Sequence, residues 1–262
     1  MPQRGRLVAL EGPSGVGKSR VAAAATRRFG WAVLAEAYDR LDRTPSLRFA
    51  DDEALLSLET VLLEEDARRF RDAEHLVAEG ATVLADTGFV GTVSYTAALA
   101  ATGQCRPATW RRLLGRAEAL ARRSLLGLPD ITVCLVAPEE LRAEREARDP
   151  RRHPAEFRAR HREAGLYEAE VFWPWLASRL PRRVAVVRSV GPPEQVAGRL
   201  DRLLRRGSRA RAPAALLDRA LVALARAGLP TRPGSEGGAP PPLRRTGATV
   251  KNGTPSARPP SA

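Results

Sequence analysis

Short apolar runs recur along the chain, and longer amphipathic stretches separate them. Within each run the apolar residues stand at successive positions, which indicates strands that are covered on both faces. Such strands are typical of a parallel sheet that lies between layers of helices. The predicted strands span residues 6–11, 31–37, 81–86, 130–137 and 183–189.

The stretches between the predicted strands repeat their apolar residues at helical spacing. Regular alternation of strands and helices predicts an α/β fold with a five-stranded parallel sheet and helices on both faces. In such folds ligands bind at the carboxyl ends of the strands, so we expect a functional site at that edge. The predicted helices span residues 19–29, 51–79, 88–101, 108–125, 138–148, 155–179 and 192–206.

The link between the first predicted strand and the first predicted helix carries a phosphate-binding motif. It reads GPSGVGKS over residues 12–19 and matches the pattern G-x-x-x-x-G-K-[ST] of the P-loop NTPase fold. In that arrangement backbone amides surround the phosphates, the lysine reaches the outer phosphates, and the serine hydroxyl binds Mg²⁺. The predicted nucleotide-binding residues are Gly12, Pro13, Ser14, Gly15, Val16, Gly17, Lys18, Ser19 and Arg20.

Lysine is almost absent from this chain, which makes the lysine of the motif more informative. The sequence contains 43 lysine and arginine residues, and only Lys18 and Lys251 are lysines. Since arginine serves wherever a positive charge alone is needed, a lysine at position 18 indicates a site that needs a compact ammonium group.

The rest of the sequence argues against several other classes of nucleotide-dependent protein. A guanine-specific GTPase needs an Asn-Lys-x-Asp element, and the chain has no lysine between residues 18 and 251. Ring ATPases favour Asp-Glu after the second key strand, whereas Asp86 is followed by Thr87. The Leu-Ser-Gly-Gly-Gln segment of transporter ATPases is absent. Small P-loop kinases remain, for which we expect ATP as the phosphate donor and magnesium (Mg²⁺) as the cofactor.

Asp86 ends the third predicted strand, at the edge where the P-loop opens. We expect its carboxylate to hold Mg²⁺, directly or through water, or to accept the proton of the phosphate acceptor. An aspartate that only caps the next helix would look the same in the sequence. The predicted metal ligands are Ser19 and Asp86.

Arginines are clustered after the fourth predicted strand, where a closing lid could bring guanidinium groups onto the transferring phosphates. Arg142, Arg145 and Arg148 are spaced three residues apart, and Arg151 follows in a proline-bounded loop. A solvated face of Arg and Glu residues would show the same pattern. The predicted catalytic residues are Lys18, Asp86, Arg145, Arg148 and Arg151.

Over roughly residues 5–206 the chain resembles the thymidylate kinase family. LVALEGPSGVGKS is similar to the opening strand and loop of that family, and PDITVCLVAPEELRAEREAR to its Pro-Asp strand and lid helix. Within AEGATVLADTGFVGTVSYTAAL, Thr92 and Tyr95 fall in the family's register relative to Asp86. The resemblance implies transfer of the γ-phosphate of ATP to a nucleoside monophosphate. It also implies an acceptor site at Glu36, Arg68, Phe89 and Tyr95.

Two departures from the family bear on the identity of the acceptor. Thr87 stands where the family has an arginine after the aspartate, and Ala35 stands where it has another. Both missing arginines belong to the acceptor-phosphate site of the family, so we expect weak activity on thymidine monophosphate. The two missing arginines could be replaced by others in the chain, namely Arg40, Arg43, Arg48, Arg68 and Arg69.

Glu36 is the basis of a second interpretation. A glutamate that ends the second strand is similar to the general base of deoxynucleoside kinases, which phosphorylate a bare 5′-hydroxyl group. The acceptor is then a nucleoside or another small hydroxyl metabolite. A further alternative is a regulatory protein that binds ATP and docks a partner through its basic tail.

The composition of the chain changes near residue 206. We expect residues 1–206 to form the kinase domain and residues 207–262 a basic tail, rich in Pro, Gly and Arg, that is mostly disordered. From Arg205 onward the formal charge is +9, out of +13 for the whole chain. Residues 212–228 could form a helix. A marginal helix exposed to solvent is favoured over a helix that docks on the core. Removal of the tail is accordingly expected to leave the core stable.

The cysteines favour a cytoplasmic protein. Cys105 and Cys134 fit no metal-binding spacing and are expected to be free thiols in a reducing compartment. The sequence contains no apolar run long enough to cross a membrane, and we expect no signal peptide. Nucleic-acid binding is disfavoured because the tail lacks interleaved aromatic residues. The expected partner is a small-molecule acceptor; a homodimer and a partner for the tail are left open.

Overall fold

The computed structural model describes residues 5–41, 49–148 and 155–206, together with residues 221, 224, 226 and 228–230 of the following segment. Among these residues five strands form one parallel sheet in the order β2-β3-β1-β4-β5. The fold class predicted from the sequence is therefore confirmed. The strands are β1 (Arg6–Glu11), β2 (Ala32–Leu34), β3 (Thr82–Asp86), β4 (Ile131–Val136) and β5 (Val184–Arg188).

The helices lie close to the stretches that the helical spacing predicts. They are α1 (Lys18–Phe29), η1 (Ala37–Arg40), α2 (Asp52–Ala78), α3 (Phe89–Ala101), α4 (Pro107–Arg122), α5 (Glu139–Ala147), α6 (Ala155–Tyr167), η2 (Glu168–Phe172), α7 (Trp173–Arg179) and α8 (Pro193–Arg206). One prediction differs from the structure, because the single helix expected over 155–179 is divided into α6 and α7. The two are joined by η2, a π-helical turn, and Pro174 lies in the first turn of α7. Turns of this kind are frequent at functional sites.

The register of the sheet brings the predicted site together. β1 lies between β3 and β4, with Leu10 paired to Asp86 and Glu11 paired to Cys134. The P-loop follows β1 directly, and Asp86 is the last residue of β3. Because the strands are parallel, the loop and the carboxylate lie at the same edge of the sheet.

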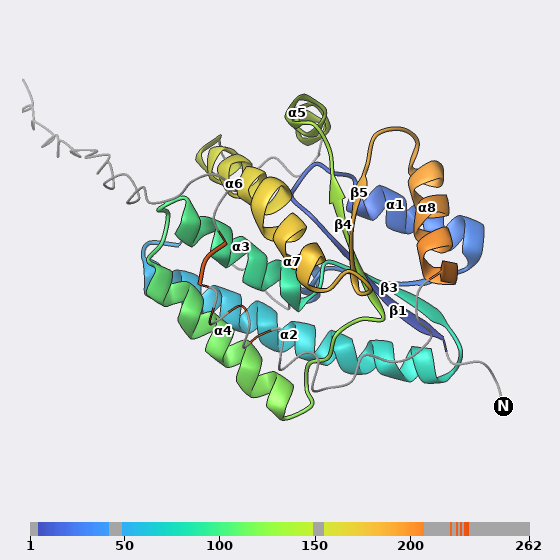
Figure 1. Cartoon of the computed structure of the whole chain (residues 1–262), viewed down its shortest axis with the longest axis horizontal. Helices are drawn as coiled ribbons and strands as arrows, with labels where there is room; N and C mark the ends of the chain where they lie inside the picture. The colour runs from blue at the N-terminus through green and yellow to red at the C-terminus, as the bar shows by residue number, and fades with distance from the viewer. Residues whose placement is uncertain are drawn as a thin grey trace, which may run out of the picture.

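Helices cover both faces of the sheet (Figure 1). α1 and α8 pack on one face, where Val21 and Leu200 belong to one buried cluster with residues of β1 and β4. α2, α3, α4 and the α6–α7 pair lie on the other face, in the cluster that includes Trp110 and Trp173. The second face carries more helices, and the larger of the buried apolar clusters lies there.

Part of the predicted tail packs against the domain that contains the sheet. Leu221 and Leu224 are helical and are each 3% exposed, in the same cluster as α3, α4 and α6. The hydroxyl of Tyr167 donates a hydrogen bond of 2.6 Å to the carbonyl oxygen of Pro230. This packing differs from the solvated helix that the sequence favours. The apolar face of the segment is visible in its sequence, but the surface that covers it is not.

Two smaller expectations can also be compared with the structure. Cys105 and Cys134 are both buried, and neither forms a disulfide. Within the described ranges, no helix combines the length and the apolar character that crossing a membrane requires.

Candidate active site

The P-loop connects β1 to α1 in a conformation that depends on its glycines. Gly12, Gly15 and Gly17 have φ angles of 124°, 76° and 92°, a region that other residues rarely adopt. A Cβ atom at Gly12 would also lie 2.2 Å from the carbonyl oxygen of Leu135. The ammonium of Lys18 donates to the Gly12 carbonyl at 2.9 Å, so the lysine lies over the loop that it follows.

The hydroxyl of Ser19 and the carboxylate of Asp86 are in direct contact. Ser19 Oγ donates to Asp86 Oδ2 at 2.8 Å, while the buried Oδ1 has no partner among the described residues. Burial raises the pKa of Asp86, and the nearby ammonium of Lys18 opposes that shift. An unpartnered carboxylate oxygen beside a hydroxyl suits Mg²⁺, which usually takes one or two protein oxygens together with phosphates and waters. The two predicted metal ligands therefore fit the ion.

Two arginines of α5 bind the carbonyl groups of the P-loop. Arg145 donates to Val16 O at 2.9 Å and to Ser189 O at 3.0 Å, which ties the loop to the end of β5. The buried Arg142 donates to Ser14 O at 3.0 Å. Both guanidinium groups thus fix the backbone of the P-loop against α5. Only Arg145 belongs to the predicted catalytic set, although the three-residue spacing places Arg142 on the same face.

Another predicted lid arginine, Arg148, is not brought to the loop. Arg148 lies at the end of α5 with an exposed side chain, and it forms an ion pair of 2.6 Å with Glu144. This partner is one helical turn away, so the pair is local and solvated. Arg151 lies outside the described residues.

The second carboxylate of the site is Glu36, at the carboxyl end of β2. It is half-buried, and Thr87 Oγ1 lies 3.4 Å from its Oε1. Thr87 has a φ angle of 60°, which is uncommon for a residue other than glycine and is often found at functional sites. Thr87 thus holds an uncommon backbone conformation beside Glu36.

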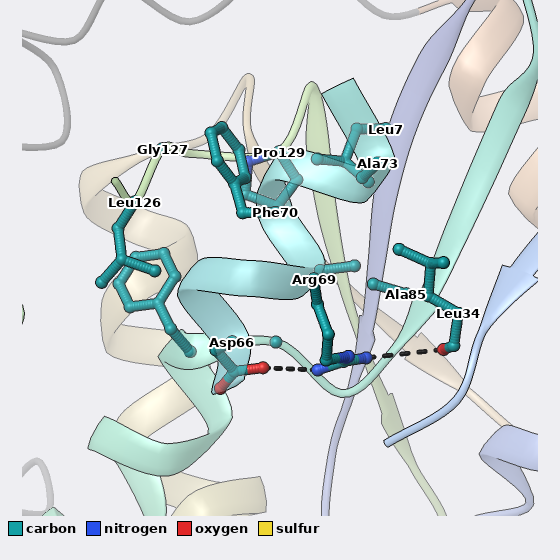
Figure 2. A pocket seen from close by; sticks show the side chains of 13 residues that line it. Leu7, Leu34, Asp66, Arg69, Phe70, Ala73, Ala85, Leu126, Gly127 and Pro129 are labelled. Carbon is teal, nitrogen blue, oxygen red and sulfur yellow. Dashed lines mark hydrogen bonds and ion pairs between the residues drawn. The ribbon is translucent and has the colours of Figure 1, made fainter. Parts of the chain in front are cut away.

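Arg69 is buried behind this edge of the site. Figure 2 shows it beside Asp66, with which it forms an ion pair, and directed toward the end of β2 at Leu34. The guanidinium donates to Asp86 O at 3.0 Å and to Leu34 O at 3.4 Å. Arg69 thereby fixes the ends of β2 and β3 relative to each other, and it is a structural residue rather than a free phosphate ligand.

Arg68, which the resemblance places in the acceptor site, lies on the outer side of α2. Its side chain is 60% exposed and pairs with Glu65 at 2.9 Å. Arg40 of η1 binds the same carboxylate at 3.1 Å and also Asp72 at 2.8 Å. Consecutive helical residues point about 100° apart. Arg68 therefore faces solvent while Arg69 faces the core.

The two predicted aromatic residues of the acceptor site have different surroundings. Phe89 is buried and lines a small pocket between α2 and the sheet, together with Phe70 and Leu126 (Figure 2). Tyr95 stacks on His161 of α6, with 4.8 Å between ring centroids, and burial raises the pKa of its hydroxyl. Tyr95 thus connects α3 to the helix that follows the lid.

Four buried carboxyl groups near α3, none of which is among the site residues expected from the sequence, form what we call the acidic lining. Its members are Glu11, Glu59, Asp66 and Glu168. Burial raises the pKa of Glu11 and of Glu59 to about 8, that of Glu168 to about 7 and that of Asp66 to about 6. Neighbouring positive or hydrogen-bonding groups oppose the shift at Glu11, Glu168 and Asp66. Buried acids are rare without full pairing, so the acidic lining calls for a functional explanation.

One signal in the sequence could have identified two members of the acidic lining. Glu59 and Asp66 stand at helical spacing within the apolar stripe of α2, which also contains Leu55, Leu56 and Leu63. Acidic residues within an apolar stripe are expected to be buried. Glu11 and Glu168 gave no such signal, because only the fold brings them near α2.

The sheet order, the P-loop after the central strand and the arginines of α5 against that loop define the architecture of a small P-loop kinase. No protein-family model matches the chain, and no curated protein matches it in sequence. Solved structures do match it. A deoxyadenosine kinase from M. mycoides with bound dATP is similar over 75% of this chain and 99% of that chain, with 12% identity and a TM-score of 0.56.

Two further structures support the same assignment of fold. The same kinase with the products dCMP and dCDP bound has 12% identity and a TM-score of 0.54, over 76% of this chain and 98% of that chain. A thymidylate kinase from Candida albicans is 17% identical, with a TM-score of 0.53, over 77% of this chain and 92% of that chain. The chain thus has the fold shared by nucleoside and nucleotide kinases, which confirms the predicted resemblance at the level of the fold.

Proposed function

We propose that this protein is a kinase that transfers the γ-phosphate of ATP to a hydroxyl group of a small, nucleoside-like molecule. One arrangement carries the proposal: Glu36 faces Thr87 at the edge where Ser19 and Asp86 are paired. The charge of Glu36 is close enough to raise the pKa of Asp86, although burial is the larger cause. A carboxylate able to accept a proton thus lies beside residues suited to bind phosphate and metal.

Each of these residues has a distinct role in the proposed reaction. Lys18 and the backbone amides of the P-loop bind the phosphates, and Arg145 approaches them from α5. Ser19 and Asp86 hold Mg²⁺, which when bound neutralises charge on the transferring phosphates. Glu36 accepts the proton of the acceptor hydroxyl group, and the hydroxyl oxygen forms a bond to the γ-phosphorus of ATP. The bond from that phosphorus to the bridging oxygen breaks, and ADP leaves.

A nucleoside monophosphate, which the thymidylate kinase resemblance implies, fits this edge of the site less well. Arg40, Arg68 and Arg69 are the described candidates to replace the missing arginines, and each is held by a carboxylate or by backbone carbonyls. Arg43 and Arg48 lie outside the described residues. Loss of two charge-assisted contacts, each of about 1.5 to 3 kcal/mol, weakens binding of a monophosphate by about a hundredfold or more. We therefore propose an acceptor without a phosphate group.

The proposal is tested by incubating the protein with Mg²⁺, ATP and a panel of nucleosides, their monophosphates and other hydroxyl metabolites. Mass spectrometry then identifies each compound that gains a phosphate group. We expect kcat/KM for an unphosphorylated acceptor to exceed that for thymidine monophosphate by at least about tenfold. Glu36→Gln should lower kcat by about a hundredfold or more, whereas Glu79→Gln, at the exposed end of α2, should not.

Two results would contradict this assignment in different ways. Efficient turnover of thymidine monophosphate would show that other arginines bind the acceptor phosphate. Tight binding of ATP without transfer to any compound would instead support a regulatory ATP-binding protein.

A further inference from the structure

Glu11 approaches α3 at the point where that helix begins. Its Oε1 accepts a hydrogen bond of 2.9 Å from the backbone amide of Gly88. A Cβ atom at Gly91 would lie 2.5 Å from the other carboxylate oxygen, so the glycine leaves room for this side chain. Glu11 thus reaches from the end of β1 into the first turn of α3.

The other members of the acidic lining surround the following turn of the same helix. Thr92 donates to Asp66 at 3.3 Å, and Ser94 donates to Glu168. Glu59 lies near both of these carboxyl groups, because each of them contributes to the raised pKa of Glu59. Carboxyl groups from β1, α2 and η2 therefore converge on the first half of α3.

Two members of the acidic lining have unused hydrogen-bonding capacity. Glu11 is fully buried, and its Oε2 has no hydrogen-bond partner among the described residues. Glu59 is 4% exposed and makes no hydrogen bond or ion pair within the same part of the chain. A buried acceptor without a partner is costly to the folded state. These oxygens accordingly indicate a group that donates hydrogen bonds and is supplied from outside.

The positively charged side chains near the acidic lining already have partners of their own. Arg69 pairs with Asp66, while Lys18 and Arg142 are bonded to carbonyls of the P-loop, where they serve the nucleotide. The guanidinium of Arg160 lies 4.4 Å from the centroid of an aromatic ring. Within the described ranges, no group of three or more acidic, histidine or cysteine residues is placed to hold a metal ion. A metal ion therefore does not explain the acidic lining.

We infer that the acidic lining selects a phosphate acceptor that carries a protonated amino group, such as an aminonucleoside, an amino sugar or an aminocyclitol. An ammonium group donates three hydrogen bonds and would stabilise the ionised form of carboxyl groups whose pKa burial raises. A phosphate group in the same place would be repelled by each carboxyl group that ionises. The inference rests on the proposed function, since it names the class of acceptor for that site.

The test is an equilibrium binding experiment without ATP, so it does not depend on phosphate transfer. Calorimetry at pH 7 compares three compounds, a 3′-amino-3′-deoxynucleoside, a 2-amino-2-deoxyhexose and an aminocyclitol, each with its N-acetyl derivative. Acetylation removes the charge and keeps the rest of the molecule. We expect at least one free amine to bind at least about tenfold more tightly than its derivative, as one charge-assisted contact allows.

Variants connect this preference to the acidic lining. Glu59→Gln and Glu168→Gln keep the shape of each side chain but remove its ability to ionise when the amine binds, and ATP binding verifies that each variant is folded. The preference should fall to less than about threefold in the double variant and in part in each single variant. Glu64→Gln, an exposed glutamate on α2, should retain it fully.

Two outcomes would overturn the inference: no preference for the amine in any of the three pairs, or a preference that survives in the double variant. A kinase that transfers phosphate but shows no preference contradicts the inference alone. An amine preference without transfer to any compound contradicts only the proposed function.

Discussion

Ser19 and Asp86 come from opposite sides of the active-site edge and meet in a hydrogen bond of 2.8 Å. The serine lies in the first turn of α1, the aspartate ends β3, and the free carboxylate oxygen of the pair is buried. The pair thus joins the phosphate-binding loop to the neighbouring strand at the position suited to a metal ion.

Replacing Asp86 by Asn should abolish Mg²⁺-dependent transfer while the protein stays folded. The amide can still accept the hydrogen bond of Ser19, but it can neither neutralise the ion nor take up a proton. We expect kcat to fall by at least about a hundredfold. Asp130→Asn is the matched control, because Asp130 is buried and accepts from Leu7 N at the opposite end of the sheet. An unchanged rate and metal dependence in Asp86→Asn would reduce Asp86 to a structural role.

Lys18→Arg should also inactivate the enzyme, although the charge is kept. A planar guanidinium cannot occupy the position of a compact ammonium over the loop, where Lys18 contacts the Gly12 carbonyl. Turnover is expected to fall by at least about a hundredfold, as measured by steady-state kinetics. Arg27→Lys, an exposed change on the same helix, should have no effect. Near-normal turnover in Lys18→Arg would argue against the role assigned to the P-loop.

The acidic lining predicts that the unliganded protein loses stability as the pH rises. Glu59 binds its proton more tightly in the folded protein, where its pKa is about 8, than in the unfolded chain, where it is near 4.5. This contribution to stability is complete below pH 4.5 and is lost as the pH rises through 8. Asp66 and Glu168 face Glu59 and strengthen the effect. The thermal midpoint should fall by several degrees between pH 6 and pH 8.5.

Two variants separate this effect from the general response of the protein to pH. Glu59→Gln should reduce the pH dependence without abolishing it, because the raised pKa values of Glu11 and Glu168 remain. Glu64→Gln on the exposed side of α2 should leave it unchanged. If Glu59→Gln shows the full fall in thermal midpoint, Glu59 is not the titrating group.

The packing of the C-terminal segment predicts that its removal destabilises the kinase domain. Truncation after residue 206 removes the buried Leu221 and Leu224, and Leu→Ala at either position alone should cost about 2 to 5 kcal/mol. Truncation after residue 230 retains both leucines and the hydrogen bond from Tyr167, so it is the control. Equal unfolding free energies for the two truncated proteins would show that the segment contributes nothing.

The sequence predicts those parts of the protein whose signals are local. The five strands and the P-loop follow from apolar runs and from one motif, and each depends on residues that are close in sequence. Asp86 could be selected because the end of a parallel strand fixes its edge of the sheet.

Other features depend on geometry that the sequence does not display. Arg68 and Arg69 each pair with an acid three residues earlier, yet the Arg68 side chain is exposed and the Arg69 side chain is buried. The two arginines are adjacent in the sequence, and each has an acid three residues before it. Only their positions around the helix decide which one is buried. The acidic lining joins residues as distant as Glu11 and Glu168, whose proximity results from the order of the strands and helices.

The contact between Tyr167 and Pro230 also has a consequence for synthesis of the protein. Ribosomes make a chain from its N-terminus, so every strand of the sheet emerges before Leu221 and Leu224 do. Until then the apolar surface of α3, α4 and α6 that these leucines cover stays in water. The newly made domain therefore passes through a period in which this surface can bind chaperones or other nascent chains, and the period ends when the helical segment with Leu221 and Leu224 docks.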